Sequence, residues 1–171
     1  MLGYVVAEEP GAADLLIQDV AERLRKAGVR IAGAVQVNLE TDPALKCHMD
    51  LHILTGDTVI RISQNLGALS RGCRLDPDGL ERAVGLVASA LAGGADLLIV
   101  NKFGKQEADG RGFRPLIGDA LAAGIPVLTA VNTGNIDAFG SFAEDMAQRL
   151  PLNSQEVANW CLAHLPDPAT P

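Results

Sequence analysis

The sequence predicts an α/β fold in which a largely parallel β-sheet is flanked by helices and carries an inserted β-hairpin. Two observations predict it. Short apolar runs alternate along the chain with longer segments of helical period, which favours right-handed crossovers between parallel strands. The chain is 48% apolar but only 4% aromatic, as in sheets whose two faces are buried by aliphatic side chains. The length of 171 residues suits a single domain over 1–165, followed by a Pro-rich tail over 166–171.

The first part of the chain begins with a strand and a helix and ends in a hairpin. The elements expected in order are a strand at 2–7, a helix at 13–27, a strand at 30–39 and a hairpin with arms at 47–54 and 58–63. Apolar residues recur at helical spacing in the helix, and Gly28 supplies its stop. The two arms of the hairpin flank a Thr-Gly-Asp turn, so we expect them to lie beside the parallel core.

The second part continues the alternation of helices and buried strands. The elements expected in order are a helix at 76–91, a strand at 95–100, a polar loop at 104–112, a helix ending at 123, a strand at 126–131, and helices at 136–150 and 154–164. Asp76 and Pro77 provide a cap and a first-turn proline for the first of these helices. Ligands of parallel sheets bind beyond the carboxyl ends of the strands, so two loops there are of functional interest.

Charge and composition exclude several classes of partner. The formal net charge of −7 repels duplex DNA and acidic membrane surfaces, and few aromatic rings are available to stack on single-stranded bases. Cys47, Cys73 and Cys161 lie far apart, which argues against a disulfide framework or a four-cysteine zinc site. No export signal or membrane-spanning run is recognisable in the sequence. We therefore expect a cytoplasmic protein without nucleic-acid partners or membrane insertion.

The first loop of interest, which we call the acidic loop, runs from Glu8 to Asp14 between the first strand and the first helix. A Walker A loop of the pattern GxxxxGK[ST] occupies this position in P-loop proteins. Aligning Gly11 with its second glycine places Ala12 and Ala13 where lysine and hydroxyl are needed, and sliding by one residue supplies no lysine either.

The loop therefore has a P-loop position without P-loop chemistry. Its candidate residues are Glu8, Glu9, Gly11 and Asp14. Pro10 removes a backbone donor, and the acids face any phosphate that approaches. The loop is either a strand-to-helix turn capped by its own acids or a site for a cation or amine.

The second loop of interest, which we call the basic loop, covers residues 101–114 after the most apolar strand. It holds four of the fourteen basic residues of the chain and nets +2, so the remainder carries −9. The predicted anion donors are Asn101, Lys102, Lys105, Arg111 and Arg114, joined by Arg61 and Arg74 if the hairpin folds over the same edge. Interleaved glycines let such donors converge on an oxyanion. The alternative is a solvated loop paired with nearby acids.

Two further patterns bear on specificity and metal binding. The strand followed by Asn101-Lys102 is similar to a guanine-reading NKxD motif, but Gly104 stands where the aspartate is needed. This strand also ends without the Walker B acid that holds magnesium. In the hairpin, His48, Asp50 and His52 share one face of a strand, so Asp50 with either histidine forms a weak metal pair or simply a polar, solvent-facing surface.

Four runs of the sequence carry a family resemblance. They are Cys47 to Leu51, Ile62 to Gly67, Gly72 to Pro77 and Val100 to Ala108. The chain resembles an uncharacterised bacterial family of domains of unknown function that is distantly similar to the THEP-type nucleoside triphosphatases. The resemblance implies a P-loop-like fold and an association with molybdenum transport, while Ala12 and Ala13 argue against triphosphate hydrolysis.

The leading hypothesis is a binding protein for a small oxyanion or phosphorylated ligand, with molybdate or a nucleotide as the bound species. Molybdate is a tetrahedral oxyanion and is chemically compatible with the basic loop. The enzyme alternative is a nucleoside triphosphatase that uses an unconventional lysine, Lys102 or Lys105. The third possibility is a homo-oligomeric interaction module without a ligand, and molybdate-transport components are the protein partners expected from the resemblance.

Overall fold

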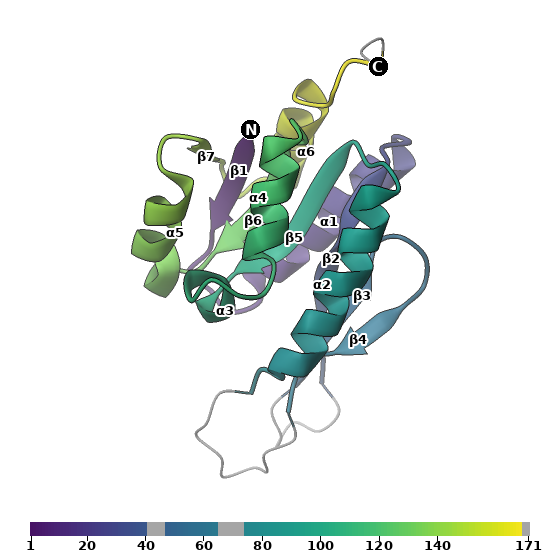
Figure 1. The fold of residues 1–171 in the computed structure, drawn as a ribbon. Coiled ribbons are helices and arrows are strands. Elements are labelled where there is room, and N and C mark those ends of the chain that lie inside the picture. Colours follow the sequence, from purple (N-terminus) through teal and green to yellow (C-terminus); the bar gives the residue numbers. More distant parts are fainter. Residues whose placement is uncertain (41–46, 65–73, 169–171) are drawn as a thin grey trace.

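The computed structural model describes residues 1–40, 47–64 and 74–168, and its described strands form one sheet in the order β4-β3-β2-β5-β6-β1-β7 (Figure 1). The strands are β1 (Leu2–Val6), β2 (Ile31–Leu39), β3 (His48–Ile53), β4 (Val59–Arg61), β5 (Leu97–Phe103), β6 (Val127–Val131) and β7 (Ala147–Arg149). The five strands β2, β5, β6, β1 and β7 are parallel, and the hairpin β3–β4 is added antiparallel to β2. The predicted fold class is confirmed. Cys73 and the end of the predicted tail lie outside the described residues.

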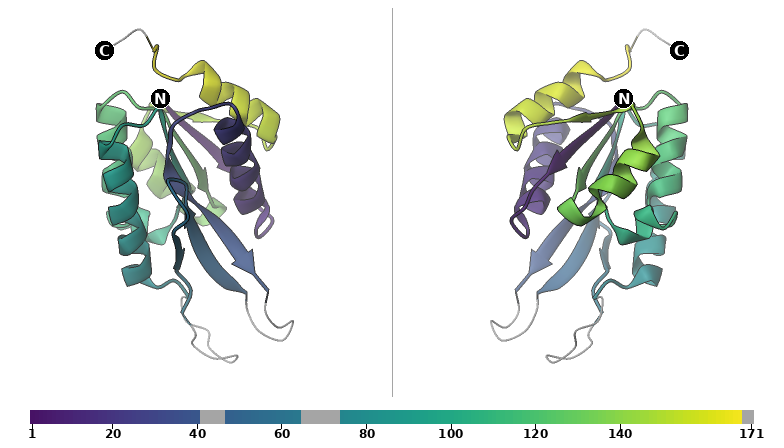
Figure 2. Two further views of the ribbon diagram at one scale, coloured as in Figure 1. Left: turned by 90° about the vertical axis from the view of Figure 1, so that its right-hand side faces the viewer. Right: turned by 90° about the vertical axis from the view of Figure 1, so that its left-hand side faces the viewer.

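Helices cover both faces of the sheet, as Figure 2 shows. They are α1 (Ala12–Lys26), α2 (Pro77–Ala92), α3 (Lys105–Ala108), α4 (Arg114–Ala122), α5 (Ile136–Ala143) and α6 (Ser154–Ala163). Helices α2, α4 and α5 enclose one apolar core, which includes Val87 and Ile117, whereas α1 and α6 enclose a second, which includes Ile17 and Val157. Both faces of the parallel sheet are therefore shielded from water, which explains why the parallel strands are nearly continuous apolar runs.

The two long helices begin at different kinds of cap. In α2 the Asp76 carboxylate accepts a hydrogen bond from Asp78 N–H, and Pro77 occupies the first turn, as expected from the sequence. Helix α1 instead begins after Gly11, whose φ of +79° is in the left-handed region. Its basic last turn and acidic first turn both complement the helix dipole.

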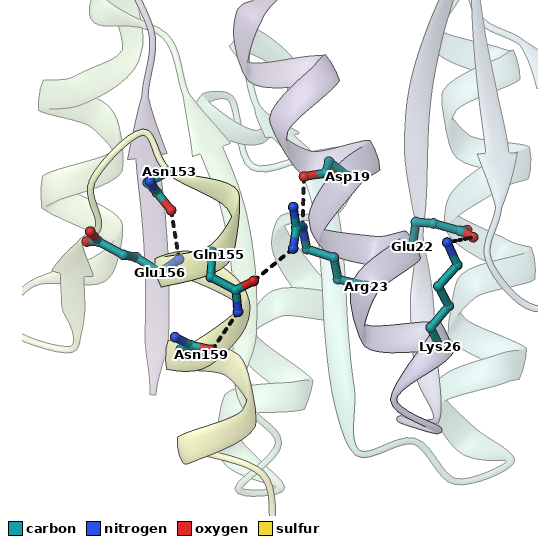
Figure 3. Close-up of polar contacts among 8 residues, drawn as sticks. All are labelled: Asp19, Glu22, Arg23, Lys26, Asn153, Gln155, Glu156 and Asn159. Carbon is teal, nitrogen blue, oxygen red and sulfur yellow. Dashed lines mark hydrogen bonds and ion pairs between the residues drawn. The ribbon is translucent and has the colours of Figure 1, made fainter.

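Helices α1 and α6 lie side by side on their face of the sheet and are joined by polar contacts (Figure 3). Arg23 Nε donates to Asp19 one turn earlier over 2.9 Å, and its Nη1 donates to Gln155 Oε1 of α6 over 2.8 Å. Asn153 caps α6 by accepting from Glu156 N–H over 3.0 Å. The first and last helices of the chain are thus fastened together above the buried core.

The structure corrects two of the predicted elements. The helix expected at 136–150 ends at Ala143, because Glu144 adopts a φ of +49° that breaks the helical path. The chain then forms β7, which pairs in parallel with β1. The loop expected at 104–112 contains the short helix α3. Among the described residues, no helix combines the length and the apolar character needed to cross a membrane.

Candidate functional site

The acidic loop connects the carboxyl end of β1 to α1. Ala12 N–H donates to Glu9 O over 3.2 Å, which closes the turn that leads into the helix. Glu8 and Glu9 are exposed to solvent, whereas Asp14 is buried in the first turn of α1. The three acids of the loop therefore have different roles, since only Asp14 faces the sheet.

Asp14 belongs to a network of amides and a carboxylate at the carboxyl edge of the sheet, in which Asn38 is exposed and the other members are buried. Its two oxygens accept from Asn38 Nδ2 over 2.9 Å and from Asn101 Nδ2 over 2.8 Å. Asn101 Oδ1 in turn accepts from Gln36 N–H over 2.8 Å, and Gln36 Nε2 donates to Asn38 Oδ1 over 2.9 Å. The network joins α1, β2 and β5, and Asn101 of β5 is hydrogen-bonded to both of the other elements.

A bulge in β5 sets the direction of Lys102. The pairing register with β6 shifts between Val100 and Phe103, which accommodates one extra residue. Asn101 is buried in this network, and the following Lys102 is half-buried at the edge of the sheet. Bulges often re-aim a side chain beside a functional site, and this one places a lysine between two cavities.

The first of these cavities, which we call the loop cavity, has a volume of about 220 Å³ and lies against the acidic loop. It is lined by Glu8, Glu9, Gly11, Asp14, Lys102 and Asn132, together with neighbouring small and apolar residues. The lysine comes from β5 and not from the loop itself.

The second cavity, which we call the amide cavity, also has a volume of about 220 Å³ and lies on the α2 side of β5. Its apolar side chains are Met49, Leu51, Ile62, Leu75, Leu80 and Phe113. Its amide side chains are Gln36, Asn101, Gln106, Asn132 and Asn135. Lys102, Lys105 and Glu107 contribute charge. The two cavities share Lys102 and Asn132, so these residues lie at the boundary between them.

The two arginines of the basic loop bind partners within the loop or next to it. Arg111 donates to Gln106 over 3.1 Å and to Asp109 over 3.3 Å. Arg114 donates to the carbonyl of Glu107 over 3.4 Å and lies over the ring of Phe142 at 5.1 Å. Lys105 is exposed and lines the amide cavity.

The two arginines predicted near the hairpin also have partners in the described structure. Arg61 forms an ion pair with Asp50, with Nε 2.9 Å from Oδ1, and Arg74 donates to the carbonyl of Cys47. Neither lines the loop cavity or the amide cavity. Of the seven predicted donors, Asn101, Lys102 and Lys105 are the ones that the structure brings together at a cavity.

Glu107 is a buried acid that the sequence analysis did not single out. Its carboxylate accepts from Gly104 N–H over 3.1 Å and from Phe113 N–H over 3.3 Å. Burial raises the pKa of Glu107 above its ordinary value of 4.5, and the nearby Glu81 adds to the rise, while the backbone donors oppose it. Glu81 itself accepts from Gly112 N–H over 2.9 Å. The basic loop is therefore folded around the buried carboxylate of Glu107, although the loop as a whole carries a net positive charge.

The predicted metal residues lie on the opposite face of the sheet from the amide cavity. His52 lines a groove between α1 and the hairpin, while Asp50 is buried and paired with Arg61. Among residues 1–40, 47–64 and 74–168, no three His, Cys, Asp or Glu side chains form a group that could hold a metal ion. The metal pair of Asp50 with His48 or His52 stays a sequence prediction.

Comparisons with known proteins give a family and a fold. The family model "Protein of unknown function (DUF2478)" matches residues 2–160. The molybdenum import ATP-binding protein ModC 2 of Bradyrhizobium diazoefficiens is 42% identical over 147 residues. These residues are 86% of this chain but 16% of that protein, so the chain corresponds to a small part of this relative.

The fold is similar to that of a solved structure with low sequence identity. The crystal structure of THEP1 from the hyperthermophile Aquifex aeolicus superposes with a TM-score of 0.69 at 15% identity. The match covers 98% of this chain and 100% of that one. The similarity in fold to the THEP-type proteins, expected from four runs of sequence, is confirmed.

Proposed function

The chain belongs to the DUF2478 family, and we propose that this member binds a small phosphorylated ligand or oxyanion in the loop cavity, with Lys102 as the cationic partner of the anion. The observation that carries the proposal is the place of Lys102. It leaves the bulge of β5 and lines the cavity formed by the acidic loop, at the carboxyl edge of a parallel sheet. Ligands of such folds bind at this edge.

The surroundings of Lys102 favour an anion in spite of the acidic residues. The cavity lies at the N-terminus of α1, a helix of 15 residues whose dipole attracts negative charge. The carboxylate of Asp14 is compensated by two amide donors. Glu8 and Glu9 are exposed, so water and salt screen their repulsion more than they screen the attraction of the half-buried lysine.

The relative suggests a setting for this binding. The name of this relative, molybdenum import ATP-binding protein, supports molybdate as a candidate anion and molybdate-transport components as partners. The match to 16% of its length supports a role for this domain beside a transport ATPase. A cytoplasmic location and a homo-oligomeric state are part of the same proposal.

A second candidate function is nucleoside triphosphate hydrolysis with Lys102 as the unconventional lysine. The likeness in fold to THEP1 favours this candidate, and Lys102 is favoured over Lys105 because only Lys102 lines the loop cavity. The carboxyl end of β5 carries Asn101 where a Walker B acid would hold magnesium. Binding without turnover is therefore the better-supported function.

The experiment that tests the proposal is calorimetric titration of the protein with phosphate, sulfate, molybdate and mononucleotides. Lys102→Gln should weaken binding of every anion by about ten- to a hundredfold, as expected for one lost charged hydrogen bond. Lys26→Gln is the matched control, because Lys26 lies in the last turn of α1 and pairs with Glu22 over 3.3 Å. Equal binding by the parent and Lys102→Gln would overturn the proposal.

A phosphate-release assay separates the two candidate functions. The parent protein is incubated with ATP or GTP and magnesium, and inorganic phosphate is followed with time. We expect no release above the buffer rate. Release by the parent that is lost in Lys102→Gln would establish the hydrolase instead.

A further inference from the structure

The amide cavity differs in character from the loop cavity that the proposed function uses. Its lining combines apolar side chains, among them Met49, Leu51 and Leu80, with several amides. A phosphate or molybdate ion gains nothing from an apolar wall, because its oxygens must exchange water for hydrogen-bond donors. The cavity is therefore built for a ligand with an organic body.

The pattern of apolar and amide groups indicates the kind of body. Small-molecule sites are mostly apolar, with a few polar groups that fix orientation. Here amides from three separate elements face one space, namely Gln36 of β2, Gln106 of α3 and Asn132 after β6. Amides both donate and accept, which suits the edge of a heterocycle, while the apolar side chains of the cavity suit its faces.

The size of the cavity limits the ligand to a small ring system. Sites for drug-sized ligands range from about 300 to 1,000 Å³, so a cavity of about 220 Å³ accepts one or two fused rings. The cavity is open to solvent at these amides, because Asn132 is exposed and Gln106 is half-buried. A ring can enter from the carboxyl edge of the sheet.

Lys102 and Asn132 connect this cavity with the loop cavity. We propose that the two cavities are the two halves of one site, in which a flat heteroaromatic ring lies in the amide cavity and the phosphate of the same molecule, linked to the ring through a sugar, is held by Lys102 in the loop cavity. This inference rests on the proposed function, which it narrows from anions in general to phosphorylated heterocycles. Molybdate and inorganic phosphate fill the loop cavity alone.

The test compares ligands that contain the ring, the phosphate or both. The probes are AMP, GMP and CMP, the matching nucleosides, inorganic phosphate and molybdate, each titrated by calorimetry. For the parent we expect at least one mononucleotide to bind about tenfold or more tightly than inorganic phosphate. Mononucleotides that bind no better than phosphate would overturn the inference and leave the proposed function intact.

A pair of methionine variants locates the ring. Met49→Gln makes the apolar wall polar with little change in volume, and should weaken mononucleotide binding about three- to tenfold without changing the affinity for phosphate or molybdate. Met146→Gln is the control, because Met146 is exposed and lines neither cavity. Gln106→Ala, in α3, is a second test if Met49→Gln lowers the melting temperature.

The outcomes separate the two proposals. Weaker mononucleotide binding in Met49→Gln or Gln106→Ala with unchanged phosphate binding supports the two-part site. Unchanged mononucleotide binding in both variants overturns it. Nucleosides that bind the parent and are weakened by Met49→Gln, with no phosphate binding at all, contradict both the proposed function and the two-part site. If Lys102→Gln loses all binding while Met49→Gln and Gln106→Ala bind like the parent, the result supports the proposed function and contradicts the two-part site.

Discussion

The acidic loop and the basic loop occupy equivalent places in the fold but differ in how their charges are used. Both follow parallel strands at the carboxyl edge of one sheet. The acidic loop leaves Glu8 and Glu9 in solvent and buries Asp14 among amides, whereas the basic loop directs its arginines to its own acids and carbonyls. Position in the sheet therefore indicates the site, while the number of charges in a loop does not identify the residues that face a ligand.

The largest expected effect is at the buried acid of the acidic loop. Asp14→Ala removes two hydrogen bonds to a charged group and leaves the buried amide of Asn101 without an acceptor, and should lower the free energy of unfolding by about 2–4 kcal/mol. Urea denaturation measures the change. Glu22→Ala in the same helix is the control, because its carboxylate is exposed and pairs with the exposed Lys26, so its loss should matter little. A small loss in Asp14→Ala would show that the network contributes little to folding.

The next effect concerns the tight packing of the basic loop around Glu107. Gly112 has a φ of +61°, and a Cβ atom there would lie 2.5 Å from Glu107 Oε1. Gly112→Ala should lower the free energy of unfolding by about 2 kcal/mol or more, from backbone strain and displacement of the carboxylate. Gly110→Ala is the matched control, since its φ is +88° but nothing lies within 4 Å of the added atom. Equal losses in the two variants would mean that backbone strain alone is responsible.

A smaller effect is expected in the pH dependence of stability. The pKa of Glu107 is raised in the folded state by burial, so between its ordinary value of 4.5 and the raised value the folded state keeps a proton that the unfolded state has released. Stability from this group is fully present below 4.5 and falls as the pH rises through that window. Glu107→Gln should remove this decrease. Unfolding free energies of parent and variant across the window give the difference, and parallel curves would contradict the assignment.

The smallest effect is expected at the exposed end of the basic loop. Arg111→Ala removes an ion pair at 3.3 Å whose side chains are 61% and 44% exposed, so unfolding free energy should change by less than about 0.5 kcal/mol. Its effect on anion affinity should also be well below that of Lys102→Gln, with Lys105→Ala between them. Calorimetry on the three variants tests this order. If Arg111→Ala loses as much affinity as Lys102→Gln, the result would support anion binding by the whole basic loop and contradict the special role of Lys102.

Much of the fold could be predicted because each buried element carries its own periodic signal. Strands β1, β2, β5 and β6 lie within a few residues of the predicted runs, since parallel strands buried on both faces are continuous apolar segments. The strand β7 was missed because its three residues carry no strand pattern and are fixed by pairing with β1. The local sequence of β7 does not indicate that it will pair with the distant strand β1.

The candidate site was harder to predict than the fold for a related reason. Lys102, Lys105 and Arg111 look alike in sequence, and the bulge that directs Lys102 to the cavities arises from the register between β5 and β6. The network of Asp14 with Asn101 joins residues 87 positions apart. A helpful signal was present in the strand itself, because polar Gln36 and Asn38 end an apolar run that otherwise suits a buried strand.

The two outermost described strands have a consequence for the protein at high concentration. β4 and β7 are each three residues long and each ends in an arginine, Arg61 and Arg149. An open sheet edge is a template on which another chain can add a strand, and short edges that carry positive charge resist such addition. The sheet thus presents little at either rim on which fibrillar aggregates can start, although its interior strands are rich in valine and leucine.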